Sequence, residues 1–326
     1  MRRREFLGVL GGAAAWSAPA PAQQAPLPVI GFLSSGSAQA FSPLVVGFRE
    51  GLNDTGYFEG RNVTIEYRYA NGEYDRLLPL AADLVQRQVA VIVAGGGAIS
   101  ALVAKKAAPT TPIVFAIGDD PIQFGVVASL NRPGGNVTGI ALFISELAAK
   151  RLELLSEMSP STSSVALLVN PKNPNAEAET KQAQTAAAAV GRELRILNAS
   201  TDEEIDATLL SLINDKTVAL LLGTDTFFFS RRDKIVVLTN HDLIPTIYFA
   251  REFAYAGGLM SYGANFAREW RQVGIYTGRI LKGEKPANLP VLQPASFQFI
   301  INLKTANALG IGIPAKLLAL ADEVIE

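Results

Sequence analysis

The chain has 326 residues, which is enough for two domains of ordinary size. Apolar residues make up 49% of it and charged residues 18%, which excludes a disordered chain and predicts a buried core. The net charge is −1, so the basic excess that neutralises phosphates is missing and a nucleic-acid partner is disfavoured. Cysteine is absent and His241 is the single histidine, which excludes disulfides, thiolate catalysis and metal centres of several such ligands. We expect no cofactor.

The first 22 residues have the order of a secretory signal peptide. Arginines at 2–4 precede an apolar stretch over 6–15, and small residues and prolines follow up to Ala22. The apolar stretch is about ten residues long, half of what a membrane-spanning helix needs. The arginines before Phe6 resemble the twin-arginine export signal, and an ordinary secretory leader is the alternative. We expect cleavage near Ala22 and, because no cysteine is available for lipid attachment, a product free in the periplasm.

The rest of the chain alternates short apolar runs with amphipathic stretches, which is the pattern of parallel βαβ units. In the first half, apolar runs predict strands at 29–33, 63–67, 89–94 and 113–117. Between them, apolar residues recur at helical spacing over 44–52, 77–88 and 98–107.

The same alternation then starts again. Strands are expected at 165–169, 194–199, 218–222 and 244–249. Helices are expected at 177–191 and 202–213. The repeated order predicts an α/β fold of two doubly wound parallel-sheet lobes, and one larger sheet is the alternative.

Ligands of such folds bind beyond the carboxyl ends of the strands, where helix N-termini present unpaired N–H groups. In the first lobe these positions hold Ser34, Ser35, Gly96, Gly97, Asp119 and Asp120. In the second lobe they hold Asn170, Asn173, Thr224, Asp225, Phe249 and Arg251. We expect a cleft that closes on a small polar solute, with Phe143 and Tyr262 as further contacts.

These residue types indicate roles, but each also has a structural explanation. Glycines let a ligand approach the backbone, Asp225 suits an ammonium group, and Arg251 suits a carboxylate held by two bonds. Equally, serine and aspartate cap helices, glycine and Asn-Pro form turns, and phenylalanine fills cores. Arg251 has a surface acid as its alternative partner. Both interpretations stay open on the sequence alone.

No catalytic motif accompanies these residues. The G-x-S-x-G elbow is absent, and His241 lies between two polar residues before a strand. Residues 278–283 have the glycine spacing of a phosphate loop but continue with Glu284 and Lys285 instead of Lys-Ser/Thr. We therefore expect a protein that is not an enzyme. An exported hydrolase or a glycosidase built on two carboxylates is the alternative.

Several stretches resemble one known family. They are 56–63 (GYFEGRNV), 74–77 (YDRL), 132–139 (RPGGNVTG), 150–155 (KRLELL), 257–263 (GGLMSYG) and 301–310 (INLKTANALG). On these residues the chain resembles the substrate-binding proteins of bacterial ABC importers, specifically the tryptophan-importer-like group. The resemblance covers nearly all of the chain after the leader. One departure is the second acid in Gly118-Asp119-Asp120-Pro121, where the family usually has Gly-Asp-Pro.

The resemblance implies a periplasmic-binding-protein type I-like fold whose two lobes are joined by a hinge of three crossings. These crossings would fall near 140–144, 261–263 and 289–291. The first lobe would then be 27–141 plus 263–288, and the second 142–262 plus 291–326. A helix at 266–281 would return to the first lobe, and a strand near 297–302 would cross back.

The resemblance also implies a function. A monomer would capture a small solute without changing it and deliver it to a membrane permease driven by a separate ATPase subunit. The solute would be an amino acid, aromatic or branched, or another small carboxylate. Sugars and amides are alternative solutes, and sensing is an alternative to transport.

Overall fold

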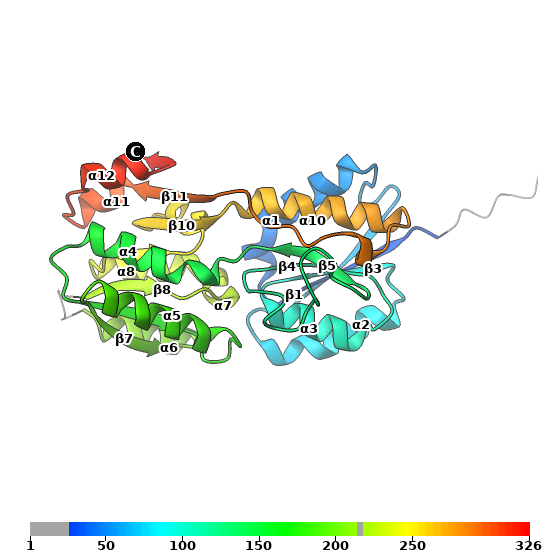
Figure 1. The fold of residues 1–326 in the computed structure, drawn as a ribbon, viewed down its shortest axis with the longest axis horizontal. Coiled ribbons are helices and arrows are strands. Elements are labelled where there is room, and N and C mark those ends of the chain that lie inside the picture. The colour runs from blue at the N-terminus through cyan, green and yellow to red at the C-terminus, as the bar shows by residue number, and fades with distance from the viewer. Residues whose placement is uncertain (1–25, 214–217) are drawn as a thin grey trace, which may run out of the picture.

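The computed structural model describes residues 26–213 and 218–326, and the signal peptide expected at 1–22 lies outside these ranges. The described chain forms two lobes, each with a central sheet between layers of helices (Figure 1). This confirms the predicted α/β fold of two lobes. Within the described residues, every helix is too short or too polar to cross a membrane.

The first lobe holds a five-stranded parallel sheet in the order β2-β1-β3-β4-β5. Its strands are β1 (Val29–Ser34), β2 (Thr64–Tyr69), β3 (Val91–Gly95), β4 (Ile113–Ile117) and β5 (Val137–Ala141). The first four agree with the predicted strands to within two residues. β5 was not predicted, because Thr138 and Gly139 interrupt its apolar pattern.

Helices cover both faces of this sheet. They are α1 (Ala38–Asp54) and α10 (Phe266–Leu281) on one face, and α2 (Leu77–Gln86) and α3 (Ala98–Ala107) on the other. Successive strand residues point to opposite faces, so Val93 packs with α1 and α10 while Ile92 packs with α2 and α3. Because both faces are buried there, β1, β3 and β4 are apolar at nearly every position, whereas the edge strand β2 is only partly buried and includes Glu66 and Arg68.

The helix α10 returns to the first lobe from the far end of the chain and packs closely on α1. Gly47 and Gly51 of α1 and Gly274 of α10 lie where a Cβ atom would overlap the backbone of the facing helix. These glycines bring the two helices into backbone contact. Trp270 and Val273 of α10 then reach the core of the first lobe, where the Trp270 ring lies 5.5 Å from that of Phe32.

The second lobe holds a seven-stranded sheet in the order β12-β11-β10-β9-β8-β6-β7. Its strands are β6 (Ser164–Val169), β7 (Glu193–Asn198), β8 (Val218–Leu222), β9 (Thr246–Tyr248), β10 (Met260–Ala264), β11 (Phe297–Asn302) and β12 (Glu323–Ile325). All neighbours are parallel except β10 and β11, which are antiparallel. The expectation of a purely parallel sheet is corrected here, because β10 runs toward the first lobe and β11 returns from it.

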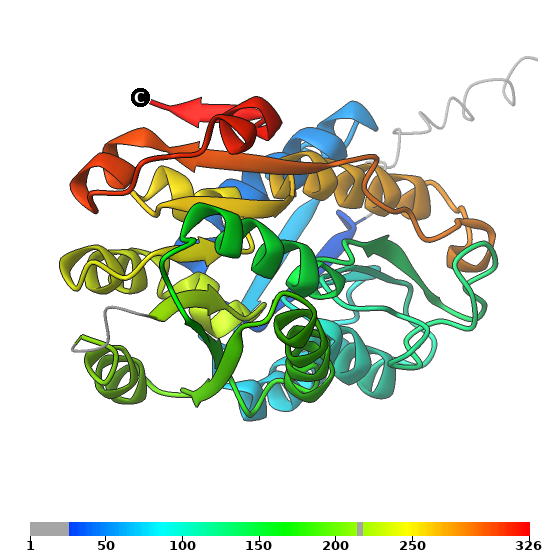
Figure 2. The same ribbon diagram turned by 60° about the vertical axis from the view of Figure 1, so that its left-hand side comes forward.

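The helices of the second lobe also form two layers. α4 (Ala148–Met158) and α5 (Ala176–Ala189) cover one face, and α6 (Asp202–Leu210) and α8 (Arg232–His241) cover the other. Four short helices complete this lobe. α7 (Thr226–Ser230) follows β8, α9 (Arg251–Tyr255) follows β9, and α11 (Leu303–Ala308) and α12 (Ala315–Leu320) follow β11. The last strand and the C-terminus lie at the outer edge of this lobe (Figure 2).

Three connections join the lobes. The first runs from β5 to α4 through residues 142–147, which include a short 3-10 helix (Ser145–Leu147), and the second joins β10 to α10 at Asn265. The third begins later than the predicted 289–291. Leu292 still exchanges backbone hydrogen bonds with Gly139 and Ala141 in the first lobe. The chain therefore crosses at 293–296, just before β11.

Candidate functional site

A cavity lies between the two lobes, at the carboxyl ends of the strands. The first lobe lines it with the loops after β3 and β4, and the second lobe with the loops after β6, β8 and β9. The helices α1 and α10, the loop after β5 and Tyr74 complete the lining. The cavity therefore has the position that a parallel-sheet topology predicts for a ligand site.

One side of the cavity is aromatic, and we call it the aromatic wall. It consists of Phe41, Phe229, Phe249, Phe266 and Trp270. The Phe41 ring stands at 87° both to Trp270, with centroids 5.8 Å apart, and to Phe229, with centroids 6.1 Å apart. Phe229 also packs against Phe249 and Phe266. Edge-to-face contacts of this kind hold the rings in place and leave flat apolar surface toward the cavity.

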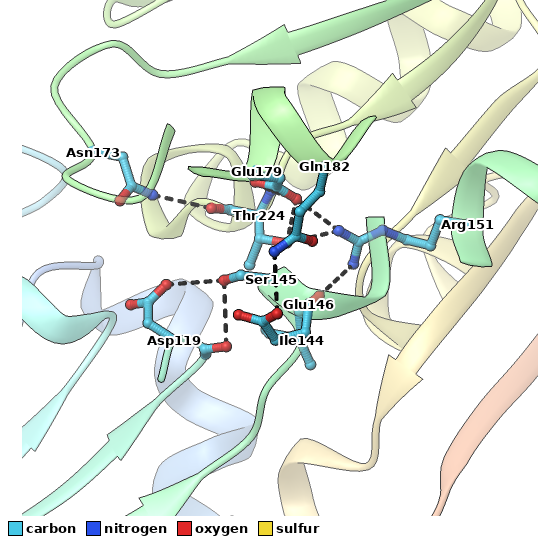
Figure 3. A network of polar contacts seen from close by, with 10 residues as sticks. Asp119, Ile144, Ser145, Glu146, Arg151, Asn173, Glu179, Gln182 and Thr224 are labelled. Atoms are coloured by element: carbon cyan, nitrogen blue, oxygen red, sulfur yellow. Dashed lines mark hydrogen bonds and ion pairs between the residues drawn. The ribbon is translucent and has the colours of Figure 1, made fainter. Parts of the chain in front are cut away.

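Asp119 lines the cavity from the first lobe. Its Oδ2 atom accepts a hydrogen bond from the Ala98 N–H at 2.9 Å. Its Oδ1 atom accepts one from the Ser145 hydroxyl at 2.9 Å (Figure 3). A carboxylate has about four acceptor positions, so the described residues leave roughly two of them open. Asp119 is only 5% exposed, and this burial raises the pKa of its carboxyl above the usual range.

Asp225 lines the cavity from the second lobe and is held differently. Its Oδ1 atom accepts from the Phe227 N–H at 2.7 Å and from the Asn170 amide at 3.2 Å. Its Oδ2 atom accepts from the Tyr74 hydroxyl at 2.6 Å and from the Asn173 amide at 2.8 Å. Burial raises the pKa of Asp225, although these four donors act in the opposite direction. All of its acceptor positions are filled.

The turn between β3 and α3 brings backbone donors to the same place. Gly96 and Gly97 have φ angles of +88° and +96°, a region that favours glycine. In the described part of the chain, their N–H groups have no hydrogen-bond partner. They precede α3, whose N-terminus carries a partial positive charge. A Cβ atom at Gly97 would lie 3.8 Å from Asp119 Oδ2, so the open carboxylate and these donors are neighbours.

A buried ion pair supports the cavity from behind. Arg151 on α4 is fully buried and donates to Glu179 at 2.7 Å, to the Thr224 hydroxyl at 2.9 Å and to the Ile144 carbonyl at 3.1 Å (Figure 3). Glu179 also accepts from the Thr224 N–H at 2.8 Å. Because Ile144 belongs to the first connection between the lobes, this network joins that connection to α5 and to the end of β8.

Residues 29–325 match the family described as ABC transporter substrate binding protein. The chain belongs to this family. It is 27% identical over 263 residues to the tyrosine-binding protein of Clostridioides difficile (strain R20291), which covers 81% of this chain and 75% of that protein.

Two solved structures give the same assignment of fold. The chain is 25% identical to an ABC domain from Streptococcus pneumoniae in complex with L-Trp, with a TM-score of 0.81 over 92% of this chain and 100% of that one. It is 23% identical to a ligand-free, open structure of a substrate-binding protein from Clostridium difficile, with a TM-score of 0.63 over 92% of this chain and 99% of that one. The chain is thus a substrate-binding protein of an ABC transporter, a family that is typically extracytoplasmic.

The structure brings most of the predicted site residues of this family member together. Those that line the cavity are Gly96, Gly97, Asp119, Asn173, Thr224, Asp225 and Phe249. Three others lie behind the lining and hold its loops. Ser34 accepts from the Gly36 N–H at 3.1 Å, Ser35 donates to the Gly96 carbonyl at 2.5 Å, and Asn170 donates to Asp225.

The remaining four predicted residues are not at the cavity. Asp120 accepts from the Ile122 N–H at 2.8 Å within a turn. The alternative role, a helix cap, is not found either, because the described residues between β4 and β5 form no helix. Arg251 forms an ion pair with Glu323 at 3.1 Å, so it binds a carboxylate of the protein instead of the expected carboxylate of the solute. Phe143 and Tyr262 pack against the apolar cores of the first and second lobes, respectively.

Of the aromatic wall, the sequence predicted only Phe249 as a site residue. It also did not predict Tyr74 and Arg151. Tyr74 and Arg151 do belong to the stretches 74–77 and 150–155 that carried the family resemblance. Trp270 lies on the apolar face of a helix, and the sequence pattern of such a face does not distinguish a residue of the aromatic wall from a core residue. Gly95 makes room for it, since a Cβ atom there would lie 2.5 Å from the indole ring.

Proposed function

We propose that this chain captures an amino acid with an aromatic side chain between its lobes and delivers it to the permease of an ABC importer. One observation carries the proposal: the open acceptor positions of Asp119 lie beside the N–H groups of Gly96 and Gly97, in a cavity with an aromatic wall. An aromatic amino acid has one group for each of these three features.

The charge of the cavity supports an ammonium group on the solute. Among the described residues that line the cavity are the acids Asp119 and Asp225, and no lysine, arginine or histidine. A solute with only a carboxylate would place a third negative charge there without a basic partner, which is costly in a buried site. We therefore favour an amino acid over a simple carboxylate. Because Asp225 is fully bonded, we assign the ammonium group to Asp119.

The carboxylate of the solute would then bind the N–H groups of Gly96 and Gly97. These donors precede a helix of ten residues, α3, whose dipole favours a negative charge at this end. Hydrogen bonds to a charged acceptor are also stronger than neutral ones. In an α-amino acid the two charged groups are attached to one carbon, which matches the adjacency of Asp119 and Gly97.

The side chain of the solute would lie against the aromatic wall. An aromatic ring gains edge-to-face or stacked contacts with Phe41, Phe229 or Trp270 beyond the burial of apolar area. The relatives agree with this choice, since one is named a tyrosine-binding protein and another was solved with L-Trp. A branched aliphatic amino acid would fill the same space without these ring contacts.

Family membership and the leader support the rest of the proposal. The protein would be exported by the twin-arginine route, cleaved near Ala22 and free in the periplasm as a monomer. It would close its lobes on the solute and release it unchanged to a membrane permease that a separate ATPase subunit drives. The cavity is lined from both lobes, so the lobes must part for the solute to enter and leave.

Thermal unfolding of the mature chain with a panel of solutes tests this proposal. L-Trp, L-Tyr and L-Phe are compared with L-Leu, with tryptamine, which lacks the carboxylate, and with indole-3-propionate, which lacks the ammonium group. At a hundredfold excess over Kd, a specific solute stabilises the protein by about 2.7 kcal/mol. We expect this effect from one or more aromatic amino acids and little from the two truncated compounds.

Two results would contradict the proposal. If sugars stabilise the chain and no amino acid does, the solute class is wrong. If indole-3-propionate binds as tightly as L-Trp, Asp119 does not receive an ammonium group. Mass spectrometry of the released solute provides a further control, because a chemically altered solute would indicate an enzyme.

A further inference from the structure

The two lobes also touch each other directly, at the cavity lining and beside it. The loop before α2 in the first lobe meets α7 and its end in the second lobe. The Tyr74 hydroxyl donates to Asp225 at 2.6 Å, and the Arg231 guanidinium donates to the Asn71 carbonyl at 3.2 Å. These partners are 151 and 160 residues apart in the chain, so only the approach of the lobes brings them together.

The second lobe holds its half of these contacts in place by itself. The Arg231 guanidinium lies 4.2 Å from the centroid of the Phe227 ring and 3.3 Å from the Asp202 carboxylate. Asp225 has three donors from its own lobe, as described above. Both groups are therefore pre-positioned, and little side-chain entropy is lost when the first lobe arrives.

The first lobe is shaped to receive α7. Gly36, Gly72 and Gly96 face this helix, and we call them the glycine seat. A Cβ atom at Gly36 would lie 2.9 Å from the Thr226 methyl group, and one at Gly72 would lie 2.9 Å from the Phe227 ring. A Cβ atom at Gly96 would lie 3.2 Å from the Thr226 methyl group. A larger residue at Gly72 would keep the lobes apart, whereas one at Gly36 or Gly96 would first overlap Phe41 or Ser35 within the first lobe.

We propose that Tyr74, Arg231 and the glycine seat form a latch that closes the lobes and sets how long the solute stays. This inference rests on the lobe closure proposed above and extends it. The latch contacts involve protein groups alone, so they favour the closed arrangement even without solute. Solute affinity then depends on the closed fraction as well as on contacts inside the cavity.

Arg231 allows the latch to be tested separately from solute contacts, because it does not line the cavity. Arg231→Gln removes the bond to Asn71 and leaves the cavity lining unchanged. Arg279→Gln is the matched control. Arg279 makes the same kinds of contact within the first lobe, an ion pair of 2.7 Å with Glu284 and a ring contact with Tyr276.

The experiment measures the distance between the lobes in the solute-free protein. Because the chain has no cysteine, Lys106→Cys on α3 and Lys181→Cys on α5 introduce two unique labelling sites on exposed positions of the two lobes. Electron–electron resonance between spin labels at these sites then reports the open and closed populations. Stopped-flow displacement of a bound aromatic amino acid gives the release rate.

We expect the unchanged protein to show a closed population without solute. Arg231→Gln should reduce this population and speed solute release by about three- to tenfold, the effect of one hydrogen bond. Tyr74→Phe should act in the same direction, and Arg279→Gln should do neither.

An unchanged protein that is fully open without solute would overturn the latch. So would populations that are identical in Arg231→Gln, Tyr74→Phe and Arg279→Gln. If no amino acid binds but the populations shift as expected, the proposed function fails and the latch stands.

Discussion

The loops that follow the strands differ between the two lobes in how fully their polar groups are hydrogen-bonded at the cavity. In the first lobe, Asp119 has two donors for about four acceptor positions, and the N–H groups of Gly96 and Gly97 have none of the described residues as partners. In the second lobe, Asp225 has four donors. Buried polar groups are normally paired, so the incomplete ones indicate where a solute completes the bonding. Under the proposed function, the first lobe therefore binds the charged groups of the solute, and the second lobe closes over it and adds Phe229 and Phe249 to the aromatic wall.

The largest expected effect tests whether the second lobe depends on its own polar network. Glu179→Gln leaves the fully buried Arg151 without its counter-charge, so the free energy of unfolding should fall by about 3–5 kcal/mol. Urea denaturation measures this change. Glu157→Gln, which removes a surface pair with Lys316, is the control and should cost less than about 1 kcal/mol. Equal losses in the two variants would contradict a supporting role for the buried pair.

The next effect tests the first lobe as the recognising one. Asp119→Asn removes the charge that the ammonium group needs, and the affinity for an aromatic amino acid should fall by about 1.5–3 kcal/mol, or roughly 10- to 150-fold. Titration calorimetry gives the value. Unfolding should not become easier, because a buried charge is removed. Asp120→Asn is the control, since Asp120 lies outside the cavity, and its affinity should equal that of the unchanged protein.

The pH dependence of binding offers a smaller and graded test. Under the proposed function the solute requires ionised Asp119, and burial raises the pKa of this carboxyl. Affinity should therefore fall as the pH is lowered through that raised pKa, starting at a higher pH than an exposed aspartate would give. Calorimetry across the pH range should show that affinity changes less with pH in Asp119→Asn than in the unchanged protein. Any pH dependence that remains in this variant is assigned to Asp225. Affinity that rises toward low pH would contradict the assignment.

The smallest expected effect concerns Arg251. Because this residue pairs with Glu323 outside the cavity, Arg251→Gln should change solute affinity by less than about 0.5 kcal/mol. Titration calorimetry with the same amino acid measures it. A loss comparable with that of Asp119→Asn would mean that Arg251 reaches the solute, and that the second lobe also recognises it.

Most of the fold could be predicted from the sequence, because buried parallel strands and amphipathic helices leave strong patterns. The strands at 113–117 and 218–222 have the bounds that the pattern predicted. The strand at 297–302 lies where the family resemblance implied one. The strand β5 and the antiparallel pairing of β10 with β11 could not be predicted in this way. The former contains Thr138 and Gly139, and the latter depends on how the chain crosses between the lobes.

The site could be predicted only in part. Topology places strand ends together, which is why Asp119 and Asp225 were both found. The sequence does not distinguish a filled carboxylate from an open one, because the donor Tyr74 of Asp225 lies 151 residues away. It also gave no sign that Arg151 is buried, since arginine is normally exposed and its position in a helix is unremarkable.

The position of α10 in the first lobe has a consequence for folding during synthesis on the ribosome. This helix ends at Leu281, yet Trp270 packs on Phe32 near the start of the chain. The first lobe emerges first but stays incomplete until most of the second lobe has been translated. The early segments of the first lobe therefore keep apolar surface exposed until α10 has been synthesised. Exposed apolar surface makes a nascent chain prone to aggregation and dependent on chaperones.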